Sequence, residues 1–561
     1  MLEIDIERER KKRKRKIAFV LSCLIPGLGQ FFRKRIAAGI FFFSVFFFMV
    51  WLIHEIWQFN PGIIGTFAGL LIFHCLNIID AYKGPTERTA PCEDRCPAGI
   101  DISLYIALIS EERFDEALKI IRDRMPLPSI CGRICYHPCE TVCTLRQRGG
   151  SLAIESLKRT ASDFTSSKSI QKMKSPKKRE NVGIIGAGPA GLSAAYFLVR
   201  MGYPVTLYEE EKEPGGLLIF GIPEFRLPDN VVRKDINFLK KMGIVIKTGV
   251  RVGKNFEFNK LREKHNAILI SAGSLRSTAI DIPGKELKGI FNALALLKKV
   301  NQNEKIILKG RVAVIGGGNS AFDAARCAIR CGADDVTIFY RRDEKEMPGI
   351  KEELDNALKE GVKIEYRTTP VRFLGKDKVE GIEFIRTELI KVKGKKRSRI
   401  KQKEGSNFKV DADAVLVATG QVPDFSFLTS TISEKIVQDR RITVNPITME
   451  TPIAGIFAAG DIIGKKRTVV DAIEMGRKAA KGIDWFLRGV GKIRRLIEQF
   501  GEFDYPLPYT VPRRKSVSGK RKEQKLLDSE KAITSFLEVE LGYTQEEAKK
   551  EASRCLQCSR R

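Results

Sequence analysis

Three apolar runs lie within the first eighty residues of the chain. Residues 36–53 carry no charged side chain, and residues 61–79 carry none apart from a histidine that can become protonated, His74. A helix that crosses a membrane needs about 20 predominantly apolar residues, so the pattern predicts that both runs cross. The run 17–32 is shorter and is interrupted by Pro26, which indicates a segment that lies in the membrane interface or re-enters it.

Basic side chains flank these runs. Residues 8–16 hold eight bases and one acid, and Lys83 and Arg88 follow the second long run. Because basic flanks stay in the cytoplasm, we expect an inner-membrane protein that contacts membrane lipids and keeps its other domains on the cytoplasmic side. Two alternatives stay open: a secretory signal that ends near Cys23, and helices that are buried in a protein core.

After residue 180 the pattern changes to short apolar strands that alternate with helices, which is typical of an α/β fold. The first strand is followed by a turn with three glycines, Gly186, Gly188 and Gly191, and the next strand ends at Glu209. Glycines let the backbone approach a pyrophosphate, the helix N-terminus faces its charge, and an acid at this place can bind ribose hydroxyls. This unit therefore predicts a dinucleotide-binding domain.

A second unit of this kind follows further along the chain. Its turn contains Gly316, Gly318 and Ala321, and its next strand ends at Arg341 and Arg342 with no acid at the tip. Two arginines at this place favour a 2′-phosphate, and hence NADPH over NADH. The alternative is that both arginines are merely solvated.

Cysteine spacing provides the candidate metal chemistry. The run Cys92-x3-Cys96-Pro97 matches the second half of the bacterial ferredoxin run, in which the last cysteine serves a different cluster from its neighbours. A C-x2-C pair near the end of the chain would supply the first half. The candidate ligands are Cys92, Cys96, Cys131, Cys135, Cys139, Cys143, Cys555 and Cys558. Eight cysteines meet the need of two all-cysteine 4Fe–4S clusters, with zinc or structural thiols and disulfides as alternatives.

Composition and charge add further limits. The chain has 561 residues and a formal net charge of +30, with a globular composition that excludes collagen, a wholly disordered chain and a small disulfide scaffold. It contains neither an HExxH pair nor a P-loop. The basic stretch 391–403 is expected to form an exposed hairpin tip. We expect no nucleic-acid binding, because this stretch has no interleaved aromatic residues; contact with anionic lipid headgroups is another role for it.

Two later apolar strands end in Ala418-Thr419-Gly420 and in Gly460-Asp461. They resemble the paired motifs of FAD/NAD(P)H oxidoreductases with two dinucleotide-binding domains. From Pro91 to Asp484 the chain resembles the small subunit of NADPH-dependent glutamate synthase and the N-terminal half of dihydropyrimidine dehydrogenase. The matching stretches include CPAGIDISLYIALI, LPSICGRICYHPCETVC, GAGPAGLSAAYFL, PGGLLIFGIPEFRLP, GGGNSAFDAA, YRRDEKEMPG and AAGDIIG.

The resemblance implies which residues bind each nucleotide. For FAD these are Gly186, Gly188, Glu209, Gly216, Leu217, Arg226 and Asp461, and for NADPH they are Gly318, Asn319, Arg341 and Arg342. The FAD domain would be split, with the NADPH domain inserted between Ser271 and Val415. The positions where the disulfide-reductase branch carries its redox pair hold no cysteines, so dithiol chemistry is not expected.

The resemblance also implies an electron-transfer flavoprotein. Electrons from NADPH would pass through FAD and two 4Fe–4S clusters to a redox partner subunit or carrier, such as a subunit similar to the glutamate synthase large subunit, a ferredoxin or a quinone-linked acceptor. No residue is predicted as a general acid or nucleophile, because the cofactors supply the chemistry. The alternatives are a glutamate synthase small subunit and a non-catalytic membrane adaptor that uses the flavoprotein fold as a docking surface.

The expected fold is α/β, with two Rossmann-like dinucleotide-binding domains, one for FAD and one for NADPH, preceded by an α-helical iron–sulfur domain and a two-span membrane anchor. The expected boundaries are residues 1–80 for the basic N-terminus and anchor, 81–164 for the helical 4Fe–4S domain, 165–180 for a linker, 181–300 and 415–490 for the halves of the FAD domain, 301–414 for the NADPH domain, and 491–561 for a basic linker and a C-terminal helix with the C-x2-C pair.

The sequence departs from its relatives at two places. Relatives carry RCLxC directly before the CxxxCP segment, whereas here this motif occupies residues 554–558. We therefore predict that the tail folds back to complete a cluster, with the ligands Cys92, Cys555 and Cys558, and with Cys143 as the fourth because the family crosses its ligands between the two cysteine groups. The alternative is that the tail pair is vestigial or binds a cluster shared with a partner. The second cluster would use Cys96, Cys131, Cys135 and Cys139, with Cys131 in place of a Gln or Glu ligand of some relatives, because Lys158 stands at the aligned position.

Overall fold

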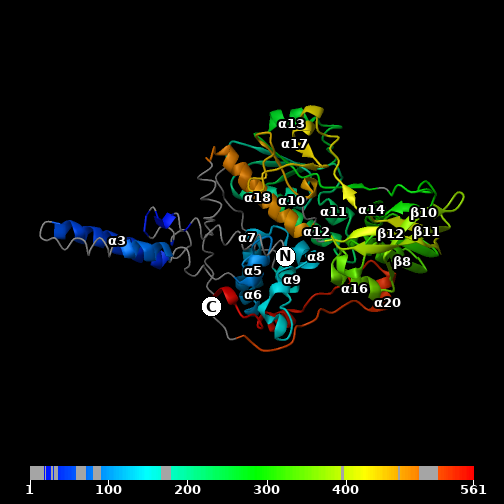
Figure 1. The fold of residues 1–561 in the computed structure, drawn as a ribbon, viewed down its shortest axis with the longest axis horizontal. Helices are drawn as coiled ribbons and strands as arrows, with labels where there is room; N and C mark the ends of the chain where they lie inside the picture. Colours follow the sequence, from blue (N-terminus) through cyan, green and yellow to red (C-terminus); the bar gives the residue numbers. More distant parts are fainter. Residues whose placement is uncertain are drawn as a thin grey trace. The chain divides into compact units, whose positions relative to one another are not determined.

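The computed structural model describes residues 18, 21–23, 25–26, 30, 36–57, 71–79, 90–165, 178–278, 280–392, 397–464, 468–491 and 516–560 (Figure 1). The chain divides into two compact units. One unit comprises Met1–Pro91, Val490–Arg514 and Gln557–Arg561, and the other comprises Cys92–Gly489 and Lys515–Leu556.

The first unit contains the helix α3 (Ile36–Trp57). Within the ranges given above, no helix combines the length and the apolar character needed to cross a membrane, so the predicted two-span anchor is not supported. Of the second predicted span only the helical residues 71–79 are described, and the rest of that span lies outside the described residues. The basic residues 8–16 lie outside the described residues, and the inner-membrane location stays a prediction.

The cysteine-rich region, residues 91–163, is helical. Its helices are α5 (Pro91–Arg95), α6 (Ile102–Ser110), α7 (Phe114–Arg124), α8 (Pro128–Ile134) and α9 (Ile154–Asp163), with the short 3-10 helices η1 (Glu140–Val142) and η2 (Thr144–Gln147) between the last two. Every residue of α6 is buried, because α7, α9 and the C-terminal helix α21 (Gln545–Ala552) pack around it. The side chain of Asp101 caps this helix by accepting a hydrogen bond from the Leu104 amide.

A five-stranded parallel sheet forms the first dinucleotide fold. Its strand order is β17-β4-β1-β2-β3, with the bounds Ile456–Ala458, Ala267–Ile270, Val182–Ile185, Val205–Tyr208 and Val245–Lys247. The helices α10 (Pro189–Arg200) and α18 (Val469–Leu487) lie side by side on this fold (Figure 1). Their close crossing depends on Gly476, where a Cβ would lie 2.2 Å from the Ala190 carbonyl oxygen.

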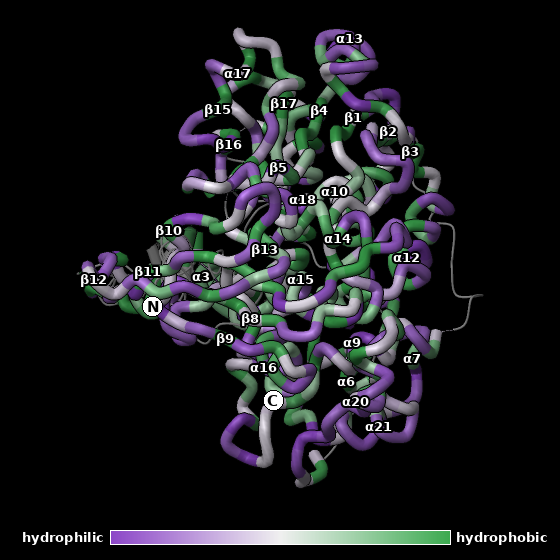
Figure 2. The backbone as a smooth tube through the Cα atoms, turned by 90° about the vertical axis from the view of Figure 1, so that its right-hand side faces the viewer, coloured by the Kyte–Doolittle hydropathy of each residue, from purple (hydrophilic) through white to green (hydrophobic). Residues whose placement is uncertain are grey.

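A second five-stranded parallel sheet has the order β6-β13-β7-β8-β9. The bounds are Ile290–Asn292, Ala414–Val417, Arg311–Ile315, Asp335–Tyr340 and Lys363–Tyr366. Hydrophobic strands of both sheets, such as β1, β4 and β13, stand out in Figure 2. The helices α14 (Ala293–Asn301), α15 (Asn319–Arg330) and α16 (Lys351–Lys359) accompany this sheet, and its core residues include Val314, Ile338 and Leu416.

This topology corrects the predicted domain boundaries. The predicted NADPH domain, residues 301–414, contains none of β6 and only the first residue of β13, yet both strands pair within the second sheet. A short parallel strand that is buried on both faces is uniformly apolar, so its sequence does not reveal which of two similar sheets it joins. The second half of the first fold therefore begins after β13, and returns to its sheet through β17.

An antiparallel sheet lies beside β8 (Figure 1). It contains β10 (Thr368–Leu374), β11 (Gly381–Ile390) and β12 (Arg399–Asp411), in this order. The predicted hairpin stretch, residues 391–403, follows β11 directly. Its last five residues, 399–403, already belong to β12. Residues 393–396 lie outside the described residues.

The C-terminal segment, residues 516–556, runs along the second unit and contains α20 (Ser529–Thr534) and α21. The 3-10 helix η6 (Cys558–Arg560) follows it. Residues 166–177 of the predicted linker 165–180 lie outside the described residues, and so do residues 492–515 of the predicted C-terminal region 491–561.

We expect acid to weaken the first dinucleotide fold through His265. Its Nε2 contacts the Tyr208 hydroxyl at 2.9 Å and its Nδ1 contacts Asn181 Oδ1 at 2.9 Å. Burial, together with the charges of Lys264 and Lys247, lowers the pKa of His265 to about 4, from about 6.5 in an unfolded chain. Between these values the unfolded chain binds more protons, so stability falls as the pH drops from about 6.5 to about 4.

Thermal unfolding of the wild type and of His265→Gln at pH 7 and pH 5 measures this effect. The wild type is expected to lose more of its Tm between the two pH values than the variant, which cannot gain a proton at this position. Equal losses of Tm would show that His265 does not couple proton binding to folding.

Candidate functional site

The first glycine turn joins β1 to α10 and leaves an open space at the helix N-terminus. Gly186 has a φ of 93°, and a Cβ at Gly191 would lie 2.1 Å from the Gly186 carbonyl oxygen, so both positions require glycine. A Cβ at Gly188 would meet no protein atom within 4 Å. The second glycine thus faces space that a pyrophosphate can enter, at the end of a helix whose dipole favours negative charge.

Glu209 follows β2 and braces this turn. Its Oε2 accepts a hydrogen bond from the Ala187 amide at 2.7 Å, and its Oε1 accepts one from the Glu211 amide at 3.0 Å. Burial raises the pKa of its carboxyl group, against the effect of these two hydrogen bonds. A carboxylate oxygen has further acceptor capacity, so Glu209 can hold the turn and still accept from ribose hydroxyls.

The structure gathers most of the other predicted FAD residues around the start of α10. A Cβ at Gly216 would lie 3.4 Å from the Gly188 Cα, and Leu217 begins the short helix α11 (Leu217–Phe220) directly after it. A Cβ at Gly460 would lie 3.0 Å from the Ala190 Cβ. Asp461 begins the 3-10 helix η5 (Asp461–Ile463).

Arg226 lies elsewhere. Its guanidinium forms ion pairs with Asp323 of α15 at 2.8 Å and with Glu353 of α16 at 2.5 Å. Burial lowers the pKa of the Arg226 side chain, but these two carboxylates outweigh it and raise the pKa above its ordinary value. In this structure Arg226 therefore joins the two nucleotide folds, and its predicted role toward FAD stays a prediction.

The second glycine turn repeats this geometry between β7 and α15. A Cβ at Gly316 would lie 2.5 Å from the Ala418 carbonyl oxygen, so Ala418, the residue after β13, packs directly against this turn. At Gly318 a Cβ would meet only Pro348 Cγ, at 3.9 Å. Asn319 Oδ1 accepts a hydrogen bond from the Ile350 amide at 2.8 Å. Ala321 is fully buried within the turn, and Arg341 and Arg342 directly follow β8.

Three cysteines are grouped around a buried lysine, and a fourth lies near two of them. Lys158 on α9 is 5% exposed and interacts electrostatically with Cys131, Cys135 and Cys139, while Cys96 interacts in the same way with Cys135 and Cys139. Burial raises the pKa of the Cys135 thiol to about 11, and the Lys158 charge acts in the opposite direction. These are the four ligands predicted for the second cluster, and the set of thiols fits an iron–sulfur cluster.

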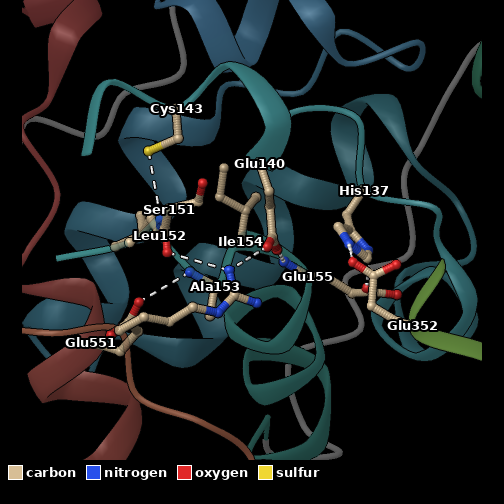
Figure 3. Close-up of polar contacts among 12 residues, drawn as sticks. His137, Glu140, Cys143, Ser151, Leu152, Ala153, Ile154, Glu155, Glu352 and Glu551 are labelled. Atoms are coloured by element: carbon tan, nitrogen blue, oxygen red, sulfur yellow. Dashed lines mark hydrogen bonds and ion pairs between the residues drawn. The ribbon is translucent and has the colours of Figure 1, made fainter. Parts of the chain in front are cut away.

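Cys92 and Cys143, two of the ligands predicted for the first cluster, lie in the same helical region. The phenol of Tyr105 interacts electrostatically with Cys139, Cys96 and Cys92, and its hydroxyl donates a hydrogen bond to the Ile154 carbonyl at 3.0 Å. The Leu152 amide donates to the Cys143 Sγ at 3.5 Å (Figure 3). Across the described residues, no group of three His, Cys, Asp or Glu side chains is close enough to hold a single metal ion. In a 4Fe–4S cluster each cysteine binds a separate iron, so the finding for a single ion does not address the clusters.

The C-terminal helix folds back onto this region. α21 packs against α6 and α9, and the Ala153 amide donates a hydrogen bond to Glu551 Oε1 at 3.0 Å (Figure 3). Arg554 donates to the carbonyl oxygens of Gly149 and Gly150, at 3.1 and 2.8 Å. The chain therefore brings Cys555 to the loop that follows Cys143, although the ligand assignment itself stays a prediction.

Several residues that sequence reasoning missed support the cysteine region. His137 has a φ of 33°, and its Nδ1 lies 2.7 Å from Glu155 Oε2 while its Nε2 lies 3.5 Å from Glu352 Oε1 (Figure 3). Burial lowers the pKa of His137, but the two carboxylates raise it to about 12. The histidine thus links the loop between Cys135 and Cys139 to α16. No sequence signal predicted this contact, because it joins residues far apart in the chain.

Two dinucleotide folds joined to a cysteine-rich helical region define an NADPH-dependent FAD/iron–sulfur oxidoreductase. A family comparison supports each part. The chain belongs to the pyridine nucleotide-disulphide oxidoreductase family, whose model matches residues 180–476. Residues 85–170 match the model of the 4Fe–4S cluster region of dihydropyrimidine dehydrogenase domain II. The predicted cofactors FAD and NADPH and a 4Fe–4S centre are thereby confirmed.

Individual relatives agree with this assignment. The NADPH-Fe(3+) oxidoreductase subunit beta of Geobacter sulfurreducens is 36% identical over 516 residues, which cover 84% of this chain and 76% of that protein. The NADP(+)-dependent formate dehydrogenase subunit beta of Moorella thermoacetica is 34% identical, with coverage of 84% and 71%. The glutamate synthase (NADPH) small chain of Halomonas elongata is 36% identical, with coverage of 70% and 87%. The resemblance to glutamate synthase small subunits is therefore confirmed.

Proposed function

We propose that the chain takes electrons from NADPH and passes them, through FAD and two 4Fe–4S clusters, to a redox partner subunit or carrier. When bound, the flavin accepts two electrons at once and releases them singly, which suits it to join a nicotinamide to iron–sulfur centres. The residues of the chain bind and orient these groups. The eight cysteines discussed above supply the thiolates for two clusters.

The observation that carries this proposal is the direct attachment of the cysteine region to the FAD fold. Asp235 of α12 (Asp229–Lys241) is fully buried and accepts hydrogen bonds at 2.9 Å from both the amide and the hydroxyl of Ser129, at the start of α8. The Tyr196 hydroxyl on α10 donates to the Arg122 carbonyl at 2.7 Å. The helix that carries Cys131 is thus fixed on the fold that holds the flavin, as a relay of single electrons requires.

The names of the relatives support a partner subunit. Three of them are described as a subunit or a small chain of a larger enzyme. By analogy, the acceptor for this chain is a partner subunit similar to the glutamate synthase large subunit, a ferredoxin or a quinone-linked carrier. A glutamate synthase small subunit is the alternative within this class.

Anaerobic spectroscopy of the purified full-length chain tests the proposal. We expect about eight irons per chain and NADPH-dependent bleaching of the flavin absorbance, followed by reduction of the iron–sulfur absorbance. An adaptor without redox function would bind the cofactors but show no bleaching, and stoichiometric zinc with negligible iron would overturn the cluster assignment.

A further inference from the structure

The antiparallel sheet brings an additional basic residue to the second nucleotide fold. β10 of this sheet packs against β8, whose end carries Arg341 and Arg342 (Figure 1). The chain between β11 and β12 returns toward the loop that follows β8. Arg397 lies two residues before the start of β12.

A set of hydrogen bonds holds this hairpin on the loop after β8. The Ser398 hydroxyl donates to Glu346 Oε1 at 2.6 Å, and its amide donates to the same oxygen at 3.2 Å. The Ser398 carbonyl accepts from Nε and Nη2 of Arg342, both at 3.4 Å. Further along β11, the Thr387 hydroxyl donates to the Arg341 carbonyl at 3.0 Å. Because Ser398 is buried and bonded on both sides, the backbone of Arg397 has a fixed place beside Arg341.

The acidic residues of this loop are occupied by other cations. Asp343 pairs with Arg367 at 2.5 Å, and Glu344 pairs with Lys351 at 2.5 Å. These two carboxylates are therefore neutralised by Arg367 and Lys351 and do not offset the arginines at the end of β8.

The remaining charges leave an excess of positive potential. Glu346 pairs with Arg342 at 3.2 Å. Among the described residues, neither Arg341 nor Arg397 forms an ion pair with a carboxylate. Burial and the neighbouring charges of Arg342 and Arg397 lower the pKa of the Arg341 guanidinium, which shows that the three groups act on one another. Three guanidinium groups that share one carboxylate form a site for a dianion.

We propose that Arg397 determines cofactor specificity by binding the 2′-phosphate of NADPH together with Arg341. The proposal rests on the NADPH site at the end of β8. Arg342 is held by Glu346 and the Ser398 carbonyl, so it positions the hairpin. Arg341, directly after β8, and Arg397, shortly before β12, present their donors to the phosphate from two different segments. Planar guanidinium groups suit this task, because each can donate two parallel hydrogen bonds to phosphate oxygens.

Binding of adenosine 2′,5′-bisphosphate and of 5′-AMP to the full-length holoprotein, measured by calorimetry, tests this role. Arg397→Ala is expected to raise the Kd for the bisphosphate about ten-fold, since a charge-assisted hydrogen bond is lost, and to leave the Kd for 5′-AMP unchanged. Arg397→Lys is expected to recover part of the affinity, because it restores the charge without the paired donors.

Lys401→Ala is the matched control. Lys401 is exposed on the same hairpin, opposite Glu388 on β11, so its loss changes the net charge equally but removes no phosphate contact. Equal effects of Arg397→Ala and Lys401→Ala would overturn the proposal, and so would an unchanged Kd in Arg397→Ala. If Arg341→Ala still weakens binding of the bisphosphate in that case, the NADPH site stands without Arg397; if Arg341→Ala also has no effect, the NADPH site itself is wrong.

Discussion

Replacing both Cys555 and Cys558 with serine is expected to lower the bound iron from about eight to about four atoms per chain. The tail would then no longer provide two of the four thiolates predicted for the first cluster. FAD content and NADPH-dependent bleaching of the flavin are expected to stay near normal, because the substitutions leave both glycine turns intact. Electron transfer to any acceptor beyond the flavin is expected to fall to background. Iron analysis and electron paramagnetic resonance of the reduced protein measure these effects.

The structure favours substitution over truncation for this experiment. Glu551 is 1% exposed and accepts hydrogen bonds from the amides of Ala153 and Lys522. Removing α21 would leave these groups without partners and expose α6, so a truncated chain could lose both clusters through unfolding. Cys331→Ser is a matched control, since this half-buried thiol lies at the end of α15. Unchanged iron in the double variant would refute the predicted ligand set.

Gly188→Ala is expected to weaken FAD binding by about 1–3 kcal/mol, or about ten- to a hundredfold, without weakening the fold. The φ of Gly188 is −77°, which alanine adopts freely, and the added Cβ would meet no protein atom within 4 Å. The methyl group would instead occupy the space through which the backbone approaches the pyrophosphate. The Kd for FAD, measured by reconstitution of the flavin-free protein, and the Tm of that protein separate the two effects.

The second turn supplies the control for this variant. Gly318 has a φ of −98°, and its Cβ would meet only Pro348 Cγ at 3.9 Å. Gly318→Ala is therefore expected to retain FAD and to lose affinity for NADPH. If both variants lose FAD equally, the assignment of the two folds to two different nucleotides is wrong.

Local patterns were sufficient to predict both nucleotide folds. Each unit is a strand, a glycine turn and a helix that follow one another directly in the chain. The positive φ of Gly186 and of Gly316, and the contact of a Gly191 Cβ with the Gly186 carbonyl oxygen, require glycine within the turn itself. The assignment of β13 failed, because a buried parallel strand has the same apolar sequence in either sheet. The predicted anchor rested on apolar length alone, and the described residues do not support it.

The cysteine region shows a different limit. Spacing identified the candidate thiols, the Cys-Pro rule separated Cys92 from Cys96, and the family resemblance assigned the others to two clusters. The structure groups Cys131, Cys135 and Cys139 around Lys158, while the ligand sets stay a prediction. Sequence reasoning considered Lys158 only as an unsuitable ligand. Its position as a buried cation beside three thiols depends on the packing of α8 against α9, where a Cβ at Gly132 would lie 2.6 Å from the Arg159 Cα. A close approach of two helices at a single glycine produces no periodic pattern in the sequence, so it could not be predicted.

The C-terminal segment also bears on the order of biosynthesis. Residues 516–556 contact the cysteine region and both nucleotide folds: Arg330 of α15 donates to the Ser535 carbonyl, the Val539 amide donates to the Phe225 carbonyl, and the Arg521 amide donates to the Gly149 carbonyl. Because a ribosome makes the chain from its N-terminus, these residues emerge after both nucleotide folds. The loop of the cysteine region at Gly149, although made early, is therefore covered only after the tail has been made. If Cys555 and Cys558 bind the first cluster as predicted, iron insertion into that cluster would be a late step of maturation.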